Sequence, residues 1–484
     1  MSSSGLLSIA RSALMSQQTA LQVISQNIAN AQTPGYSRQE AVLQATPPVR
    51  FSYGSIGSGV TVATVVRKRD ILLDDSFRSA NGLASGSEMR RDLVGQLESV
   101  FGEPSDSGLS NALDQFWGGW SDLATSPHSG AAKAVLQQRG RQAASLFNQF
   151  DSQLTQARSS TLDRVGNTIA TINQTALQIS DLNGRIVTSE GDGHTANDLR
   201  DERDLKIDTL SKLAGVRVIN QIDGSVSVII GNSTLVDGIT ARPLASQLVP
   251  PVPMPAVTPS DIPIKVTLGN SQDALSPLGG ELKSLLDFIN NDVAGARNRL
   301  DALAAQLVSG VNAEHVQGFV FNGAAIPGTA AGNFFDAGTG ANPVRASTIK
   351  LDAVISADAT RITASRDVNA PTNNANAIAI SAMRTKAGTV SFLATPSGPP
   401  ETGSFDRFYR TMVTGIGVAV SGASDNASIY RSLTDQAESR RQSVSGVNTD
   451  EELTNMMRVQ QAYTAASKLI KTADEMLQTL MQLV

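Results

Sequence analysis

Apolar residues repeat every seven positions at both ends of this 484-residue chain, and this repeat limits what the ends can form. The N-terminal stripe consists of Leu7, Leu14, Leu21 and Ile28, with Ile24 in a companion position. The C-terminal stripe consists of Met456, Tyr463, Ile470 and Leu477, with Val459 and Leu480 in companion positions. Such a repeat is typical of helices that pair through an apolar seam. Because isolated helices are only marginally stable in water, we expect these two to pair with each other.

A stripe of this kind is more often one face of a globular core than a pairing surface. The position of both stripes favours pairing, because chain ends are usually poorly ordered unless another element holds them. Between Ser2 and Ser37 the only ionisable side chain is that of Arg11, so the first helix has few charges to stabilise it in water. We therefore expect the two ends to become ordered by pairing with each other.

The N-terminal stripe ends in the stretch NIANAQTPGYSRQ, residues 27–39. Pro34 fixes φ at about −65°, which suits the first central position of a type II turn, and Gly35 supplies the positive φ of the second. Proline also disfavours helix at Thr33, so the helix should end at or before that residue. The sequence then predicts a strand or extended arm within residues 36–73. The C-terminal helix should begin at Thr449–Asp450.

Between the ends, the residue pattern predicts long helices with β segments inserted among them. Helical spacing runs from about residue 71 to 189, with breaks at 102–104 and 126–127, and returns at 195–215, 282–307 and 404–445. Strand patterns occupy 216–269, including an Asp-Gly hairpin turn, and a proline-rich connector lies at 250–263. Residues 320–400 carry short β runs. The predicted fold class is therefore mainly α with β inserts (α+β).

Three units follow from this nesting. Residues 1–35 with 448–484 would form the terminal coiled-coil helices, and 36–215 with 276–320 and 400–447 a long-helix domain. Residues 216–275 with 321–399 would form a β-rich outer insert.

Charge and composition exclude several classes of function. The net charge is −5 and no block of like charge occurs, so neither nucleic acid nor an anionic membrane surface is an expected partner. The absence of cysteine removes disulfides, thiolate nucleophiles and zinc–sulfur sites. No stretch approaches the roughly 20 apolar residues of a membrane span, so no membrane insertion is expected. No cleavable secretory signal is recognisable.

No convincing catalytic, cofactor or metal site emerges. The acids in DLRDERDLK, residues 198–206, alternate with arginines and a lysine, so we expect a solvated face with ion pairs three and four residues apart. His128 and His194 fall in predicted loops, and His315 is more consistent with a packed histidine than with a ligand. Trp117 and Trp120 should anchor helix packing, with a sugar platform as the rarer alternative. We therefore expect no enzyme activity, no cofactor and no metal.

The two end motifs resemble those of flagellar axial proteins, the family of rod, hook and hook-associated proteins. The similarity rests on residues 27–39 and on SVSGVNTDEELTNMMRVQQAYTAASKLIKTADEML, residues 443–477. Within that family the Gly-Tyr-Ser-Arg-Gln ending is most similar to the FlgK group of hook-associated proteins. Residues 199–218 and 279–319 agree with this group, whereas 220–275 and 320–400 do not, so an outermost β domain is reduced or missing.

The resemblance implies a structural, non-enzymatic protein of the bacterial flagellum at the hook–filament junction. It would be secreted through the flagellar type III export channel with an uncleaved signal, and would lie outside the cell between hook and filament. Its implied partners are a ring of further copies, the hook protein, a second hook-associated protein and an export chaperone at the C-terminal helix. Alternatives are another axial protein of the hook or distal rod, a surface adhesin, or a wall hydrolase on an axial scaffold.

Overall fold

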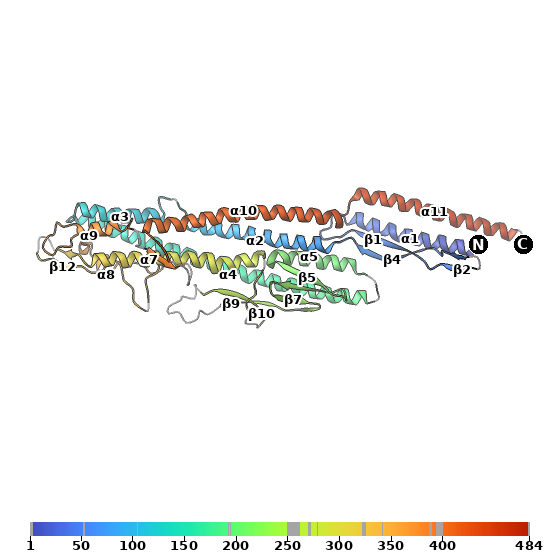
Figure 1. Ribbon diagram of the computed structural model, residues 1–484, viewed down its shortest axis with the longest axis horizontal. Helices are drawn as coiled ribbons and strands as arrows, with labels where there is room; N and C mark the ends of the chain where they lie inside the picture. Colours follow the sequence, from blue (N-terminus) through green and yellow to red (C-terminus); the bar gives the residue numbers. More distant parts are fainter. Residues whose placement is uncertain are drawn as a thin grey trace.

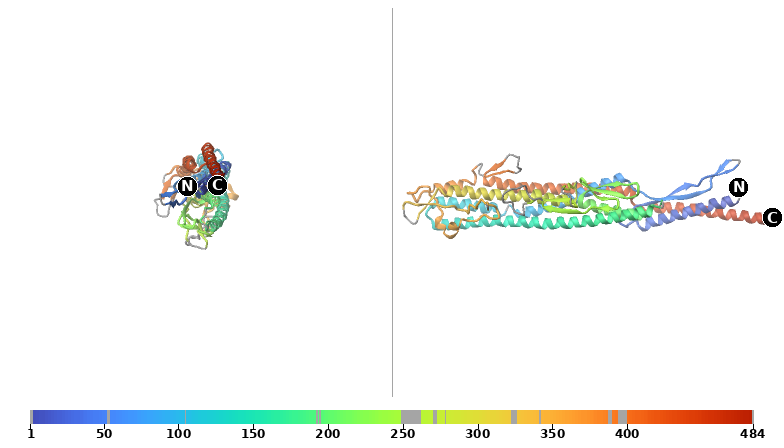
Figure 2. Two further views of the ribbon diagram at one scale, coloured as in Figure 1. Left: turned by 90° about the vertical axis from the view of Figure 1, so that its right-hand side faces the viewer. Right: turned by 90° about the horizontal axis from the view of Figure 1, so that it is seen from below.

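The computed structural model is a long, narrow molecule with both chain ends at one tip (Figures 1 and 2). It describes residues 3–482 apart from 52–53, 104, 192, 194, 249–261, 270–272, 278, 322–325, 341, 387–389 and 394–399. The predicted connector at 250–263 and His194 thus lie largely or wholly outside the described residues. Within these ranges the molecule is mainly α with small β-sheets, which confirms the predicted fold class.

The terminal unit consists of two helices and a β arm. Helix α1 (Ser3–Ala29) runs towards the body of the molecule, and α11 (Thr449–Gln482) runs back beside it in the opposite direction (Figure 1). The arm is an antiparallel pair of β1 (Gln39–Ala45) with β4 (Val60–Arg67), continued by β2 (Val49–Phe51) with β3 (Gly54–Ile56). Because β1 and β4 contact α1, the arm lies with the terminal helices, whereas the sequence grouped it with the long-helix domain.

The body is a bundle of long helices that begin and end close to the predicted breaks. Its members are α2 (Ile71–Phe101), α3 (Leu109–Thr125), α4 (Gly130–Glu190), α5 (Asn197–Ala214), α6 (Gly280–Asp287), the π-helical turn η2 (Phe288–Val293), α7 (Ala294–His315) and α10 (Phe405–Ser445). Gly102 ends α2 in the left-handed conformation with φ 54°, and the Ser129 side chain caps α4. Helix α10 packs along α2 over much of its length (Figure 1).

Apart from the β arm, the β segments lie in two separate places on the body of the molecule. Strands β5 (Val216–Asn220), β6 (Val226–Ile230), β7 (Ser233–Asp237) and β8 (Thr240–Ala241) form an antiparallel sheet in chain order. This sheet and the hairpin of β9 (Leu244–Leu248) with β10 (Ile264–Leu268) lie along α4.

The remaining short elements surround the far ends of α3, α4 and α7. They are β11 (Phe319–Val320), β12 (Thr329–Ala330), α8 (Ala353–Ala357), η3 (Ala359–Arg361), α9 (Ala375–Ala382), β13 (Val390–Leu393) and β14 (Pro400–Gly403). The two stretches that the sequence grouped into one outer insert therefore contact different parts of the bundle, and the predicted division into three units stays a prediction.

An aromatic core fixes the end of the bundle far from the chain termini. Trp117 and Trp120 are both buried, and Trp120 packs against Phe334. His315 lies between these rings, where its Nδ1 is 2.6 Å from the Gly332 carbonyl oxygen and its Nε2 accepts the Thr363 N–H. The predictions of packing tryptophans and of a packed histidine are confirmed.

The described residues contain neither a membrane-spanning helix nor a cluster of metal-binding side chains. None of their helices combines the length and apolarity needed to cross a bilayer. Nor do three or more histidine or acidic side chains gather there as potential metal ligands.

Candidate assembly site at the terminal helices

Pairing of α1 with α11 covers the predicted stripes only in part. Ile24 is buried, as are the small side chains of Ala10, Ala466 and Ala473. Eight further residues of the stripes are partly buried: Leu7, Leu14, Leu21, Ile28, Met456, Val459, Ile470 and Leu477. Tyr463 is 39% exposed, and nothing is described of the Leu480 side chain. The structure thus brings the two stripes together but leaves much of their apolar surface open.

The other face of α1 lies against the β arm. The Ser16 hydroxyl donates to the Val60 carbonyl oxygen at 3.1 Å, and the Ser12 hydroxyl accepts the Val60 N–H at 3.4 Å. A side chain at Gly59 would collide with Ser12, so the strand approaches the helix closely there. Sequence reasoning missed these serines, because isolated polar residues on a helix carry no signal of a packed strand.

The turn after α1 has the predicted form. The Tyr36 N–H donates to the Thr33 carbonyl oxygen across Pro34–Gly35, and Gly35 has φ 82°. This geometry is that of a type II turn. The turn sends the chain back towards α1, so that residues 36–39 pass beside Asn27.

Asn27 uses all of its hydrogen-bonding capacity at this point. Its amide nitrogen donates to the Gln39 carbonyl oxygen at 2.9 Å and to Glu452 Oε2 at 3.0 Å. Its amide oxygen accepts the Gln39 N–H at 3.0 Å and the Tyr36 hydroxyl at 2.8 Å. Asn27 is 1% exposed, so these bonds replace water completely. Burial, together with the charges of Asp198, Asp201 and Glu452, raises the pKa of the Tyr36 hydroxyl, which keeps its proton available to Asn27.

Glu452, in the first turn of α11, is another buried side chain of this cluster of polar residues. Its carboxylate is 1% exposed, and Oε1 lies 2.8 Å from Arg38 Nε. The Arg38 N–H donates to the Ser445 carbonyl oxygen at the end of α10. Asn448 caps α11 by accepting the Asp450 N–H, one residue before the predicted start. We call Asn27, Tyr36, Arg38, Gln39 and Glu452 the polar seat.

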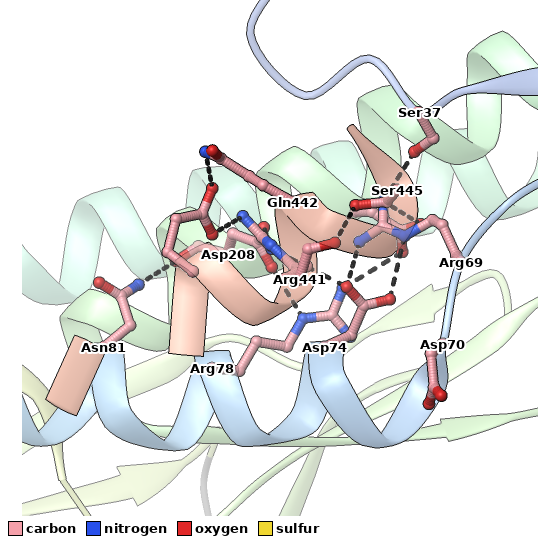
Figure 3. Close-up of polar contacts among 12 residues, drawn as sticks. Ser37, Arg69, Asp70, Asp74, Arg78, Asn81, Asp208, Arg441, Gln442 and Ser445 are labelled. Atoms are coloured by element: carbon pink, nitrogen blue, oxygen red, sulfur yellow. Dashed lines mark hydrogen bonds and ion pairs between the residues drawn. The ribbon is translucent and has the colours of Figure 1, made fainter. Parts of the chain in front are cut away.

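Behind the seat, aspartates of α5 contact arginines from β4, from the segment that follows it, and from α2 and α10; part of this cluster, including Asp208, is drawn in Figure 3. Arg67 contacts Asp201 and Asp204 at 2.7 and 2.8 Å. Arg69 contacts Asp74 at 2.6 Å and Asp204 at 3.1 Å.

The same row of aspartates also contacts α2, which packs on α5, and α10, which packs along α2. Arg78 of α2 contacts Asp208 at 2.8 Å and Asp204 at 3.3 Å. Arg441 of α10 contacts Asp208 at 2.6 Å and lies 3.7 Å above the ring centre of Phe77. We use the name arginine–aspartate joint for this cluster. Its members are Arg67, Arg69, Arg78 and Arg441 with Asp74, Asp201, Asp204 and Asp208.

This joint corrects the expectation for residues 198–206. Asp198 and Glu202 are exposed as expected, but the carboxylates of Asp201 and Asp204 are buried and their partners are remote in sequence. The face that carries these two aspartates is therefore not solvated. The reason is that two segments of the terminal unit reach α5 here: the segment after the turn, at Ser37, and the end of β4 with the residues that follow it, at Arg67 and Arg69. The Ser37 hydroxyl and N–H both donate to Asp201, at 2.7 and 2.9 Å.

Asp204 stays ionised in the joint because arginines surround it. Burial alone would raise the pKa of Asp204, but the positive charges of Arg69, Arg67 and Arg78 outweigh that effect and hold the pKa well below its usual value. The joint therefore ties the terminal unit to the bundle through charge-assisted hydrogen bonds, which are stronger than neutral ones.

Three known protein families match this chain, one over much of the helical bundle and one at each chain end. The helical domain of flagellar hook-associated protein FlgK matches residues 94–335. The flagellar basal body rod protein family matches residues 7–36, and the C-terminal domain of the flagellar basal body rod FlgEFG proteins matches residues 439–483. The end matches cover α1 with its turn and α11 with the end of α10.

Relatives of similar length extend over nearly the whole chain. Flagellar hook-associated protein 1 of Bacillus subtilis is 29% identical over 97% of this chain and 96% of its own length. The protein of the same name from Salmonella typhimurium is 26% identical over 99% of this chain and all of its own. The solved structure of the flagellar hook junction protein FlgK from Burkholderia pseudomallei is 18% identical and shares the fold, with a TM-score of 0.61 over 77% of this chain and all of that one. The chain described here belongs to the FlgK family of flagellar hook-associated proteins.

Proposed function

We propose that this chain is a non-enzymatic subunit of the junction between flagellar hook and filament, and that copies assemble side by side through their terminal helix pairs. The carrying observation is the apolar surface that stays open beside the seam. After α1 and α11 have paired within one chain, Met457, Leu469 and Met476 remain about half exposed on α11. Exposed apolar surface of this extent on a paired helix favours burial against a further copy.

The partners we propose are further copies of this chain, the hook protein on one side and a second hook-associated protein on the other. We also propose export by the flagellar route, with a chaperone that holds α11 until assembly. Membership of the FlgK family supports these proposals, and so does the placement of both chain ends at one tip (Figure 1). The relatives are flagellar hook-associated proteins by name, which supports a role for this chain in the flagellum.

The first test places a charge in the seam. Leu21→Asp and Ile470→Asp should leave the helix bundle folded and abolish junction assembly, because an unpaired charge would enter an apolar contact. Gln18→Asp is the matched control, since Gln18 lies on the exposed side of α1. Cells producing the seam variants should make hooks without filaments, while circular dichroism of the purified variants stays unchanged.

The same cells separate the alternatives. Loss of the hook itself would indicate a rod or hook protein, and normal filaments with lost surface attachment would indicate an adhesin. Unaltered filaments with both seam variants would refute assembly through the terminal helices.

A second test asks when the ends become ordered. Limited proteolysis of the free subunit should remove about the first 35 and last 35 residues and leave the bundle intact, if the ends order on assembly. Full protection of both ends would mean that the pair forms stably in the free subunit.

A further inference from the structure

The apolar seam cannot by itself define how α1 and α11 align. Tyr463, Ile470 and Leu477 occupy equivalent positions one heptad apart, as do the buried Ala466 and Ala473. A slip of α11 by seven residues therefore replaces apolar side chains with apolar side chains and changes the buried area little. In coiled coils with such a repeat, a single buried polar contact is the usual device that selects one register.

We propose that the Asn27–Glu452 contact, clamped by Arg38, fixes the register of α11 on α1 and directs α11 to the α1 of its own chain. The inference rests on the proposed function, in which neighbouring copies bring many similar helices together. In a slipped register Glu452 would lose both Asn27 and Arg38. The carboxylate is 1% exposed in the observed register, so a slip must either leave a charge unpaired or draw it out into water.

The polar seat offers Glu452 a single hydrogen-bond donor on α1, the second side-chain N–H of Asn27. Asn27 is held on three of its four hydrogen bonds by Tyr36 and the Gln39 backbone, which leaves one N–H free to reach Glu452. Asn27 is thus oriented before α11 binds. Because its side chain is already held in place, little conformational entropy is lost when Glu452 accepts its N–H, which favours this contact over others.

Preference for the same chain follows from the start of α11. Only residues 446–448 separate α10 from α11. The end of α10 is held on its own body twice, by Arg441 on Asp208 at 2.6 Å and by the Ser445 carbonyl oxygen on the Arg38 N–H at 2.9 Å. A linker this short delivers Glu452 to its own Asn27, so α11 presents its exposed flanks to neighbouring copies without exchanging partners.

The test uses the natural absence of cysteine. A cysteine at Ala10 is combined in turn with one at Tyr463, Ile470 or Leu477, and the purified full-length chain is oxidised mildly. Counting outward along the antiparallel helices from Asn27 beside Glu452, Ala10 falls nearest to Ile470. We expect the Ile470 pair to close within one chain about tenfold faster than the other two, as a charged hydrogen bond can provide.

The deciding variant is Glu452→Leu. It should bring the three closure rates within one chain to within about twofold, because the buried contact then no longer selects one register. Glu451→Leu is the matched control, since Glu451 also contacts Arg38 but is 59% exposed, and it should keep the Ile470 preference. Glu452→Gln retains the side-chain shape and should weaken the preference partly, which covers the case in which the leucine variant misfolds.

Two results would overturn the inference: an Ile470 preference that survives both Glu452 substitutions, or no preference in the unsubstituted background. Scoring filaments on cells that make the same variants keeps the two proposals distinct. An Ile470 preference that survives both Glu452 substitutions in a chain that still builds filaments would refute the inference alone, whereas a chain with intact register that builds no junction would refute the proposed function alone.

Discussion

Arg441, near the end of α10, contacts Asp208 of α5 at 2.6 Å, and so joins the segment that leads to α11 with the helix on which the N-terminal linker rests (Figure 3). Asp208 also contacts Arg78 of α2 at 2.8 Å. All three side chains are largely buried, so one carboxylate contacts two guanidinium groups away from bulk water. The remaining positive charge is met by Asp204, which contacts Arg78, and by Glu438, which contacts Arg441, so the link between terminal unit and bundle depends on a network of charges.

Replacement of Asp208 by alanine should destabilise the protein strongly. Arg78 and Arg441 would lose a buried partner, which typically costs about 3–5 kcal/mol. Urea unfolding followed by circular dichroism measures this loss. Asp181→Ala is the control, because the Asp181–Arg185 pair is exposed and should change the free energy of unfolding by less than about 0.5 kcal/mol. Equal effects of the two substitutions would show that the joint carries no special stability.

The turn at Pro34–Gly35 offers a second prediction. A methyl group at Gly35 would require a positive φ that non-glycine residues rarely adopt, and would lie 3.2 Å from Leu205 Cβ. Gly35→Ala should therefore cost about 1–2 kcal/mol and displace Tyr36 from Asn27. Faster proteolytic cleavage near residue 35, compared with Gly57→Ala in the open arm, checks this. Identical cleavage rates would show that the turn tolerates a side chain.

Local patterns in the sequence predicted most of the elements but not the contacts between remote ones. Heptads placed α1 and α11, and Pro34–Gly35 placed the turn, because those signals act within a few residues. The joint was missed for the opposite reason: the partners of Asp201 and Asp204 come from residues more than a hundred positions away. Interleaved acids and arginines on α5 look the same whether they pair with each other or with another segment.

The polar seat illustrates the same limit on a smaller scale. Asn27 lies inside a recognised motif, whereas the sequence assigns no partner to Glu452 in the first turn of the predicted C-terminal helix. Their contact could not be predicted, because it requires the antiparallel pairing and the returning turn together. The sequence signal for this contact was the position of Glu452, a charged residue directly before the apolar stripe that begins at Met456.

Two buried groups should shape the pH dependence of stability in opposite directions. Burial, with a further contribution from the charge of Lys133, lowers the pKa of His315 to about 4, against a usual 6.5. The unfolded chain then binds the proton first, so His315 reduces stability by roughly 2–4 kcal/mol as the pH falls from about 6.5 to 4. Urea unfolding at several pH values should show this slope flattened in His315→Gln. An unchanged slope would show that His315 is not buried as a neutral group.

Asp301 should act with the opposite sign. Burial raises its pKa to about 6 from a usual 3.8, although it accepts the Ala346 N–H at 2.8 Å. The folded chain binds the proton more tightly, so stability from this group is present at low pH and is lost as the pH rises from about 4 to 6. Asp301→Asn, which keeps an acceptor oxygen, should stabilise the protein at pH 7 by roughly 1–2 kcal/mol and have little effect at pH 4. Destabilisation at both pH values would contradict this.

Helix α2 carries glycines whose roles differ sharply, which allows a final prediction within one helix. A methyl group at Gly82 would lie 2.8 Å from the Ser211 carbonyl oxygen, and one at Gly86 would lie 2.9 Å from that of Gly280. Backbone cannot yield as a flexible side chain does, so Gly82→Ala and Gly86→Ala should each destabilise by about 1–3 kcal/mol by forcing α2 away from α5 and α6. At Gly95 the added methyl group would meet nothing within 4 Å, and Gly95→Ala should stabilise by up to about 1 kcal/mol through helix propensity. Thermal unfolding of the three variants decides the matter, because stabilisation at all three positions would mean that α2 does not approach α5 and α6 as closely as the structure shows.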